Sequence, residues 1–273
     1  MTATTAGSLR VGRAFAAAAR EGRLAFVAYV VAGYPDVATS ETIALAAIDG
    51  GADVLEIGLP YSDPLADGVT LQHASNVALA HGQTLDASLD LVERVARQRP
   101  DTPLLVMGYV NQFLGPRVAD AIANRLAEAG AAGAIVADLT PDEGAPLEES
   151  FERAGLALVY LVAPTSTPER IGIIGERAGG FVYCVSLTGV TGARRTGPQD
   201  ASALVERTKA ATRLPVAVGF GVSRPEHVRA VAATGADGVI VGSALVDALG
   251  ADGHNLDGFT SLCRELAGAT TAA

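Results

Sequence analysis

Short apolar segments alternate with helical patterns along the whole chain, and this alternation restricts the fold more than any other feature of the sequence. Eight segments have the length and apolar character of buried strands, and helical patterns separate them. Parallel strands need such crossover helices, so the pattern predicts a parallel α/β architecture. Eight strand-and-helix units favour a closed (β/α)8 barrel, the TIM barrel, over an open doubly wound sheet.

The expected strands cover residues 24–33, the segment around Glu56, and residues 103–107, 131–137, 156–162, 181–185, 215–220 and 238–241. The expected helices cover residues 11–21, 37–49, 85–98, 115–129, 141–154, the segment after Thr167, 201–212, 224–234, a short helix opened by Gly242 and Ser243, and 256–266. The helix over 11–21 is additional to the eight units and is expected to close the bottom of the barrel. Residues 59–81 and 186–200 are expected to be long loops, which in compact domains usually carry function.

Length and composition agree with a single large domain. The chain has 273 residues, 49% of them hydrophobic, and no linker divides it. Barrels of this size are commonly one domain, so we expect one domain over residues 1–273, with residues 1–8 as a flexible terminus. The longest apolar run, residues 24–33, is too short to span a membrane and is interpreted as the first strand.

Charge and cysteine content narrow the possible partners. The formal net charge of −10 argues against nucleic acid and anionic membranes, but it allows a small anionic substrate bound by backbone N–H groups. Cys184 and Cys263 have no metal-binding or redox spacing and form no disulfide framework, which fits a reducing cytoplasm. The four histidines are scattered without ligand spacing, so we expect no metal.

Residues 53–68 (DVLEIGLPYSDPLADG) join a strand to a loop that is rich in acidic residues. Glu56 interrupts the apolar strand, where an unpaired buried charge would be costly. Asp63 and Asp67 follow in the loop, each beside a turn-forming residue. A strand carboxylate that faces a loop carboxylate could form an acid/base pair. Alternatively, the aspartates cap turns and Glu56 forms a structural ion pair, and spacing alone does not decide between the two.

Glycine clusters after the last three strands predict a phosphate site. They are residues 189–192 (GVTG), 219–221 (GFG) and 241–244 (VGSA). In this barrel the loops after strands seven and eight often bind phosphate, because glycine lets backbone N–H groups approach the anion. The sequence has no dinucleotide fingerprint, no nucleophile elbow and no lysine at a strand end for Schiff-base chemistry. The residues therefore indicate a phosphorylated small substrate and carboxylate acid/base catalysis.

Residues 55–68 (LEIGLPYSDPLADG) resemble the signature of the tryptophan synthase α chain family. Residues 29–36 (YVVAGYPD), 136–139 (VADL), 189–192, 219–221 and 241–243 resemble family segments in the same order. The resemblance implies a lyase that performs the retro-aldol cleavage of indole-3-glycerol phosphate to indole and glyceraldehyde 3-phosphate in tryptophan biosynthesis. It also implies a cytoplasmic α subunit without a cofactor of its own, docked to a β chain that contains pyridoxal phosphate, in an α2β2 heterotetramer.

The resemblance implies roles for individual residues. Glu56 matches the catalytic glutamate that protonates indole C3 and takes the proton of the glycerol hydroxyl group. Asp67, rather than Asp63, matches the aspartate that accepts the indole N–H, and Thr191 matches a residue that orders the second long loop over the site. The positions implied to line the indole pocket are Tyr29, Met107, Ile135, Tyr183 and Phe220. The positions implied to bind phosphate are Gly192, Gly221, Gly242 and Ser243.

Three other functions remain open on the sequence. A stand-alone indole-glycerol-phosphate lyase would release free indole without a β chain. A non-catalytic regulator of a β chain would not need Glu56 and Asp67, which are both present. A phosphate-binding isomerase on the same barrel would convert its substrate without indole release. The chain also departs from common family patterns at Val69, at residues 108–112 and at Thr140, which lie near the face where the family's β chain docks.

Overall fold

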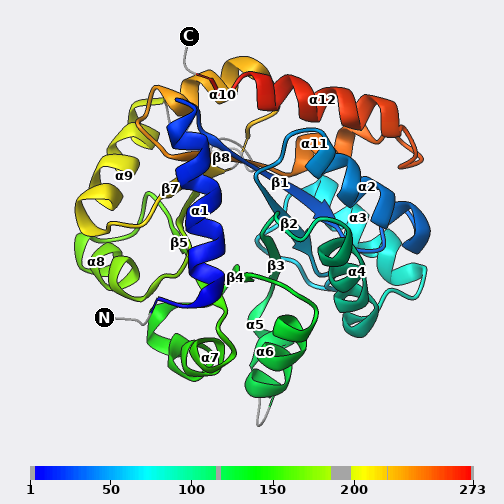
Figure 1. The fold of residues 1–273 in the computed structure, drawn as a ribbon, viewed down its shortest axis with the longest axis horizontal. Coiled ribbons are helices and arrows are strands. Elements are labelled where there is room, and N and C mark those ends of the chain that lie inside the picture. Colours follow the sequence, from blue (N-terminus) through cyan, green and yellow to red (C-terminus); the bar gives the residue numbers. More distant parts are fainter. Residues whose placement is uncertain (1–3, 115–117, 186–197, 220, 272–273) are drawn as a thin grey trace.

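Eight parallel strands close into a barrel in the order of the sequence, so the predicted (β/α)8 fold is confirmed (Figure 1). The structure is a computed structural model that describes residues 4–114, 118–185, 198–219 and 221–271. The strands are β1 (Ala25–Val31), β2 (Val54–Gly58), β3 (Leu104–Gly108), β4 (Gly133–Val136), β5 (Ala157–Val162), β6 (Val182–Val185), β7 (Val216–Gly219) and β8 (Gly238–Val241). Pairing of β8 with β1 closes the barrel.

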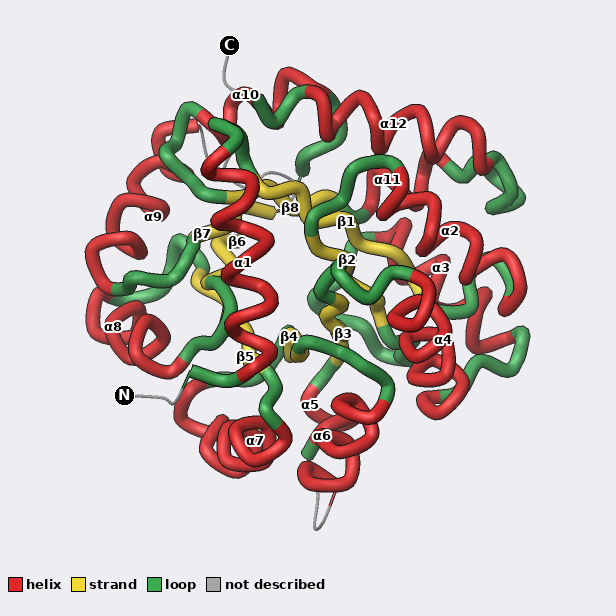
Figure 2. Tube along the Cα trace, in the orientation of Figure 1, coloured by secondary structure: helices red, strands yellow, loops and turns green. Residues whose placement is uncertain are grey.

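Helices surround the barrel on its outside (Figure 2). They are α1 (Ala6–Arg20), α2 (Val37–Asp49), α3 (Val69–Ala80), α4 (Leu85–Gln98), α5 (Val110–Phe113), α6 (Val118–Glu128), α7 (Pro141–Ala154), α8 (Pro168–Arg177), α9 (Pro198–Ala211), α10 (Pro225–Ala232), α11 (Ser243–Ala248) and α12 (Leu256–Gly268). The strands are buried on both faces, by these helices outside and by side-chain layers inside, as is usual for parallel sheets. No helix in the described ranges is both long and apolar enough to cross a bilayer.

Helix α1 lies across one end of the barrel (Figure 1). Its buried residues include Val11 and Phe15. The ring centroid of Phe15 lies 5.3 Å from that of Phe181, the residue just before β6. The helix therefore closes the N-terminal end of the strands, as expected from the sequence. It begins at Ala6, five residues before the expected start, because Thr5 is its N-cap and accepts a hydrogen bond from the Ser8 N–H. The helix thus includes part of the segment expected to be a flexible terminus.

Both segments expected to be long loops differ from the expectation. Residues 59–81 are not one loop, because α3 fills their second half; its apolar and polar residues are mixed around the helix, so no clear amphipathic face announced it. The helix expected over residues 115–129 agrees with α6, which the structure describes over Val118–Glu128, and the short α5 before it was not expected. The second long loop is also shorter than expected, because α9 begins at Pro198, and residues 186–197 lie outside the described ranges.

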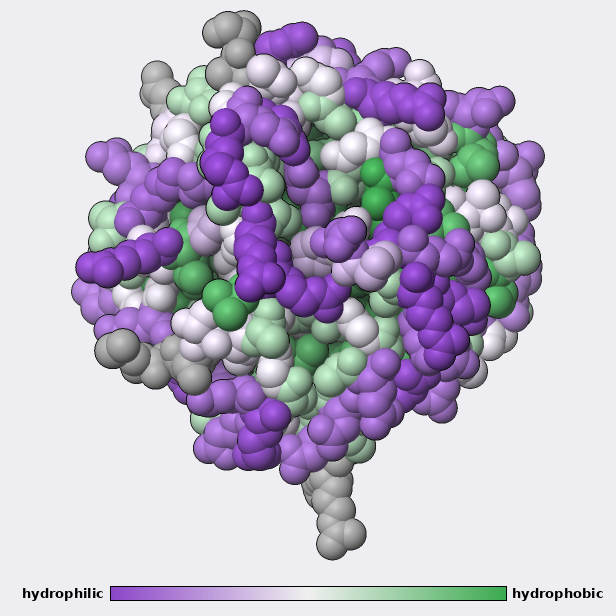
Figure 3. Space-filling model, viewed as in Figure 1, coloured by the Kyte–Doolittle hydropathy of each residue, from purple (hydrophilic) through white to green (hydrophobic). Residues whose placement is uncertain are grey.

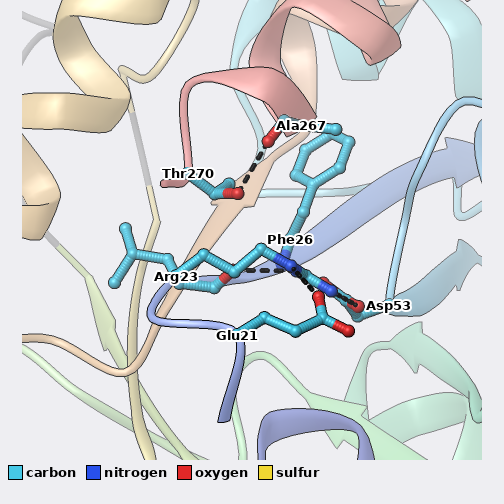
Figure 4. A network of polar contacts seen from close by, with 7 residues as sticks. Glu21, Arg23, Phe26, Asp53, Ala267 and Thr270 are labelled. Atoms are coloured by element: carbon cyan, nitrogen blue, oxygen red, sulfur yellow. Dashed lines mark hydrogen bonds and ion pairs between the residues drawn. The ribbon is translucent and has the colours of Figure 1, made fainter. Parts of the chain in front are cut away.

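A polar network fastens the N-terminal ends of β1 and β2 together (Figure 4). The Arg23 guanidinium donates two hydrogen bonds to the Asp53 carboxylate, at 2.6 and 2.8 Å, and one to Glu21 at 2.7 Å. Asp53 also accepts from the Phe26 N–H at 2.8 Å. Bidentate, charge-assisted bonds of this kind are directional. This network joins the two strands at the closed end of the barrel.

Polar side chains form much of the surface seen in Figure 3, and apolar residues appear there in small scattered patches. Among the residues that the structure describes, the most exposed large hydrophobic side chains are Leu65 at 83% and Val69 at 74%. Both belong to the connection between β2 and α4, at the C-terminal end of the barrel strands. Both are more exposed than Leu9 on α1, at the closed end, which is exposed at 48%.

Candidate active site

A cavity of about 290 Å³ lies at the C-terminal end of the strands, the end at which TIM barrels carry their active sites. It is lined by Glu56 and Asp67, by the aromatic and apolar residues Tyr29, Leu71, Met107, Tyr183 and Ile240, and by Gly68, Val69, Thr70, Gly221, Val222, Ser223, Gly242, Ser243, Ala244 and Asp247. A larger hollow, about 820 Å³, lies between α1, α7, α8 and α9 at the other end. None of the predicted site residues that the structure describes lines the larger hollow, so volume alone does not identify the site.

Glu56 is buried at the mouth of the barrel, with 1% of its surface exposed. It stands on β2 in register with Tyr29 on β1, so both side chains point into the same cavity. Among the described residues Glu56 has no ion pair, and its Oε1 atom has no hydrogen-bond partner. Burial raises the pKa of Glu56 to about 8. The side chain is therefore a protonated acid at neutral pH, and the structural ion pair considered from the sequence is not present in the described ranges.

The raised pKa of Glu56 predicts a pH-dependent stability. The folded-state pKa of about 8 lies above the usual value of 4.5, so the unfolded chain releases this proton first as pH rises. Stability linked to Glu56 is therefore complete below about pH 4.5, falls as pH rises, and levels off above about pH 8. We expect Glu56→Gln to remove this loss and to stabilise the protein by roughly 3 kcal/mol at pH 7.

The measurement is urea unfolding of wild type and Glu56→Gln between pH 4.5 and 9. The expected gain from the substitution is near zero at the acidic end and grows toward pH 8. Glu152→Gln, which removes an exposed carboxyl group on α7, is the control. An unchanged or decreasing gain as the pH rises would contradict the pKa assigned to Glu56.

Asp67 reaches the cavity from the loop between β2 and α3. Its backbone N–H donates to the Pro64 carbonyl at 3.0 Å, and its own carbonyl accepts from Gln72 Nε2 at 2.9 Å. Burial raises the pKa of Asp67 to about 6, and a hydrogen bond from the Tyr109 side chain opposes this rise. Asp63, in contrast, is exposed and does not line the cavity. The structure therefore separates the two loop aspartates, a distinction that spacing alone did not provide.

Two tyrosines form part of the cavity wall. Burial raises the pKa of Tyr29 and of Tyr183 well above the usual value, so both phenols are neutral. A Cβ atom on Gly58 would lie 2.0 Å from the Tyr29 hydroxyl, and one on Gly219 would lie 2.3 Å from the Tyr183 hydroxyl. Only glycine leaves room for these hydroxyl groups. Tyr183 both lines the cavity and packs in the inner layer of the barrel.

The other residues expected to line the indole pocket do not all line the cavity. Met107 lines the cavity, whereas Ile135 is fully buried in the inner layer of the barrel and is not among the lining residues. Phe220 and Thr191 lie outside the described ranges. Asp138 follows β4, and its carboxylate accepts a hydrogen bond from the Val110 N–H at 2.7 Å. Asp138 thus supports the turn after β3 and does not line the cavity.

Three of the four expected phosphate positions lie together. Gly221, Gly242 and Ser243 line one side of the cavity, and Ser243 is the first residue of α11. Gly221 has φ of 74°, a left-handed conformation that favours glycine. Gly192 lies outside the described ranges. In these ranges no group of three or more His, Cys, Asp or Glu side chains is placed to hold a metal ion.

Several cavity residues were not predicted from the sequence. Thr70 on α3 donates a hydrogen bond from its hydroxyl group to Asp247 on α11 at 3.0 Å, and both residues line the cavity. Ser223 lines it as well. Thr70 and Asp247 are 177 positions apart in the chain, and no local sequence pattern connects them. Only the closed barrel brings them together.

The chain is similar to tryptophan synthase α chains in sequence and in structure. The family model described as tryptophan synthase alpha chain matches residues 15–270. The tryptophan synthase alpha chain of Gloeobacter violaceus is 46% identical over 259 residues, which cover 94% of this chain and 93% of that protein. The alpha chain of Methanothermobacter thermautotrophicus is 43% identical over 249 residues, which cover 91% and 92%.

Solved tryptophan synthase structures are also similar to this chain. A structure of Mycobacterium tuberculosis tryptophan synthase superposes with a TM-score of 0.87 at 41% identity, covering 97% of this chain and 99% of that chain. The tryptophan synthase subunit alpha of Legionella pneumophila superposes with a TM-score of 0.86 at 32% identity, covering 98% and 99%. Both similarities extend over nearly the whole chain and therefore include the strand ends that form the cavity.

Proposed function

Because this chain belongs to the tryptophan synthase α chain family, we propose that its cavity residues perform the family's reaction in the roles given below. The chain is a lyase of tryptophan biosynthesis, and its reaction is the retro-aldol cleavage of indole-3-glycerol phosphate to indole and glyceraldehyde 3-phosphate. The observation that carries the assignment of roles is that Glu56 and Asp67, two carboxyl groups with differently raised pKa values, line one cavity. Pairs of this kind are typical of acid/base catalysis.

Glu56 is the proposed proton shuttle. Its protonated carboxyl group donates a proton to C3 of the indole ring. The carboxylate that results then takes the proton of the hydroxyl group on the adjacent side-chain carbon. As the bond between the ring and this carbon breaks, its electron pair returns to the ring, and the hydroxyl-bearing carbon becomes an aldehyde. One proton enters and one leaves, so Glu56 ends the cycle protonated, as a raised pKa requires at neutral pH.

Asp67 is the proposed acceptor of the indole N–H. Protonation at C3 places positive charge on the ring nitrogen, and an ionised carboxylate beside the N–H stabilises that charge. The pKa of about 6 leaves Asp67 mainly ionised at neutral pH while Glu56 is still protonated. The two groups therefore hold the required protonation states together between about pH 6 and 8.

The remaining cavity residues are proposed to hold the substrate. Gly221, Gly242 and Ser243 would bind the phosphate through backbone N–H groups and one hydroxyl, with Gly192 as a fourth position. Tyr29, Met107 and Tyr183 would contact the indole ring, and Phe220 would add to this wall. Ile135, which pairs with Met107 across β3 and β4, would support the wall from the buried layer. Thr191 is proposed to order the loop that covers the site, which would exclude water during cleavage.

Membership of the family implies a β chain as partner of this subunit. We propose that the two chains form an α2β2 heterotetramer, that the β chain carries pyridoxal phosphate, and that the α chain needs no cofactor of its own. We also propose a cytoplasmic location and a single domain over residues 1–273. The exposed side chains of Leu65 and Val69, beside the loop that carries Asp67, support docking of a partner at this end of the barrel.

The experiment that tests this function is indole release from indole-3-glycerol phosphate by the purified chain, with and without a tryptophan synthase β chain. We expect slow release by the chain alone and a sharp increase when the β chain is added. Fast release without the β chain would favour the stand-alone lyase. Absence of release under both conditions would contradict the proposed roles of Glu56 and Asp67.

A further inference from the structure

The loop that carries Asp67 is fastened to the turn that follows β3. Gln112 Nε2 donates to the Pro60 carbonyl at 3.3 Å, and Asn111 Nδ2 donates to the Tyr61 hydroxyl at 2.8 Å. At the far end of the loop, the Ala66 N–H donates to the hydroxyl oxygen of Tyr109 at 3.0 Å. Residues 109–112 therefore hold this loop at its beginning and at its end.

Tyr109 makes the contact nearest to Asp67. Its side chain is buried, and its ring is stacked on Tyr61 with the centroids 5.1 Å apart. Its backbone N–H donates to Gln112 Oε1 at 3.0 Å, which fixes the residue within the turn. The hydroxyl oxygen accepts from the N–H of Ala66, which places the hydroxyl group beside the residue that precedes Asp67, and the interaction between the Tyr109 hydroxyl and the Asp67 carboxyl group lowers the pKa of Asp67.

We propose that Tyr109 is a positioning residue for the cleavage reaction, because its hydroxyl group holds the Asp67 carboxylate at the cavity wall where the indole N–H has to be received. The inference rests on the proposed role of Asp67 and adds a residue that does not line the cavity. Tyr109 acts through Asp67 and does not touch the substrate. The bond from the adjacent Ala66 N–H fixes the hydroxyl group beside Asp67 and also holds this end of the loop.

The groups around Asp67 explain why one hydrogen bond has a large effect there. Glu56 on β2, Tyr29 on β1, Tyr183 on β6 and Asp247 on α11 share the cavity with Asp67. None of these groups carries a positive charge that would favour the carboxylate. Burial raises the pKa of Asp67, and the bond from Tyr109 lowers it. Loss of that bond therefore makes Asp67 harder to ionise and leaves its carboxylate free to rotate.

The test is Tyr109→Phe, which keeps the ring and its stacking on Tyr61 but removes the hydroxyl group. We expect kcat to fall roughly tenfold with a smaller change in KM, because the lost bond orients a group that acts most strongly in the transition state. We also expect the acidic limb of the kcat/KM profile to move to higher pH, because the pKa of Asp67 rises. A role in folding alone would leave this limb in place.

The control is Tyr160→Phe. Tyr160 is a fully buried tyrosine on β5, and its hydroxyl donates to Glu148 on α7 at 2.5 Å, away from the cavity. Its substitution removes a comparable buried hydrogen bond, so stability should fall without a shift of the pH profile. If Tyr109→Phe does not fold, 3-fluorotyrosine at position 109 preserves the fold. Its more acidic phenol is a stronger donor, and the acidic limb should then move to lower pH.

A double-mutant cycle separates this inference from the proposed function. In an Asp67→Asn background, Tyr109→Phe should have little further effect on kcat, because the two residues act as one unit. Independent, multiplicative losses together with an unmoved acidic limb would overturn the role of Tyr109 while leaving that of Asp67 intact. Full activity of Asp67→Asn itself would instead overturn the proposed function on which the inference rests.

Discussion

Glu56→Gln is expected to abolish indole release, with kcat lowered by at least about 10³-fold. Glutamine has nearly the same shape as the protonated acid, but it has no proton to give to indole C3 and cannot take the hydroxyl proton afterwards. Both proton transfers pass through this one side chain, so neither has a substitute in the mechanism. Indole release by the purified variant, measured together with the β chain, tests this directly.

Binding should survive this substitution. The phosphate positions Gly221, Gly242 and Ser243 lie on the connections after β7 and β8 and not on β2. A non-cleavable phosphorylated indole analogue should therefore bind Glu56→Gln with an affinity close to that of wild type, measured by calorimetry. Glu152→Gln on the surface of α7 is the control for the chemical change. Wild-type turnover by Glu56→Gln would remove Glu56 from the mechanism.

Asp67→Asn is expected to lower kcat by roughly 10²- to 10³-fold, which is the usual cost of removing one group that stabilises transition-state charge. An amide oxygen can still accept the indole N–H, but it lacks the negative charge that offsets the positive charge on the ring. The substitution should therefore affect kcat more than KM. Steady-state kinetics with indole-3-glycerol phosphate measure both quantities.

The pH dependence gives a second readout for Asp67. Only the ionised form is active, so kcat/KM of wild type should fall below about pH 6 as Asp67 takes up a proton. It should also fall above about pH 8, where Glu56 loses the proton it must donate. In Asp67→Asn the acidic limb should be absent while the alkaline limb stays. Asp63→Asn, on the exposed part of the same loop, is the matched control and should keep both limbs. If the acidic limb persists in Asp67→Asn, that limb belongs to a group other than Asp67.

The fold could be predicted from the sequence because each unit carries its own signals. The bounds of α2, α4 and α7 were predicted correctly, since an N-cap residue or a proline at the first turn and a glycine or basic residue at the end mark such helices. Helix α3 was missed because it has no amphipathic face and its N-cap, Gly68, offers no side chain. Its stability comes from packing on the barrel, which local patterns do not encode.

The candidate site could be predicted only where a local feature of the sequence marks a residue. Glu56 was found because a carboxylate in an apolar strand conflicts with its surroundings, and such conflicts mark functional positions. Asp67 was distinguished from Asp63 only by resemblance, and burial of one and exposure of the other now give the physical difference. Tyr109, Thr70 and Asp247 could not have been found, because their importance depends on contacts between segments far apart in the chain.

The two carboxyl groups of the cavity stand on supports of different stiffness. Glu56 lies within a strand that is hydrogen-bonded on both sides, to β1 and to β3, so its position is fixed by the barrel itself. Asp67 lies on a loop held by a few side-chain contacts, and its neighbours Leu65 and Val69 are largely exposed. A protein that covers these two side chains can therefore displace or fix Asp67 without moving Glu56. The rate of cleavage can in this way be adjusted from outside through charge stabilisation, while the proton shuttle stays in place.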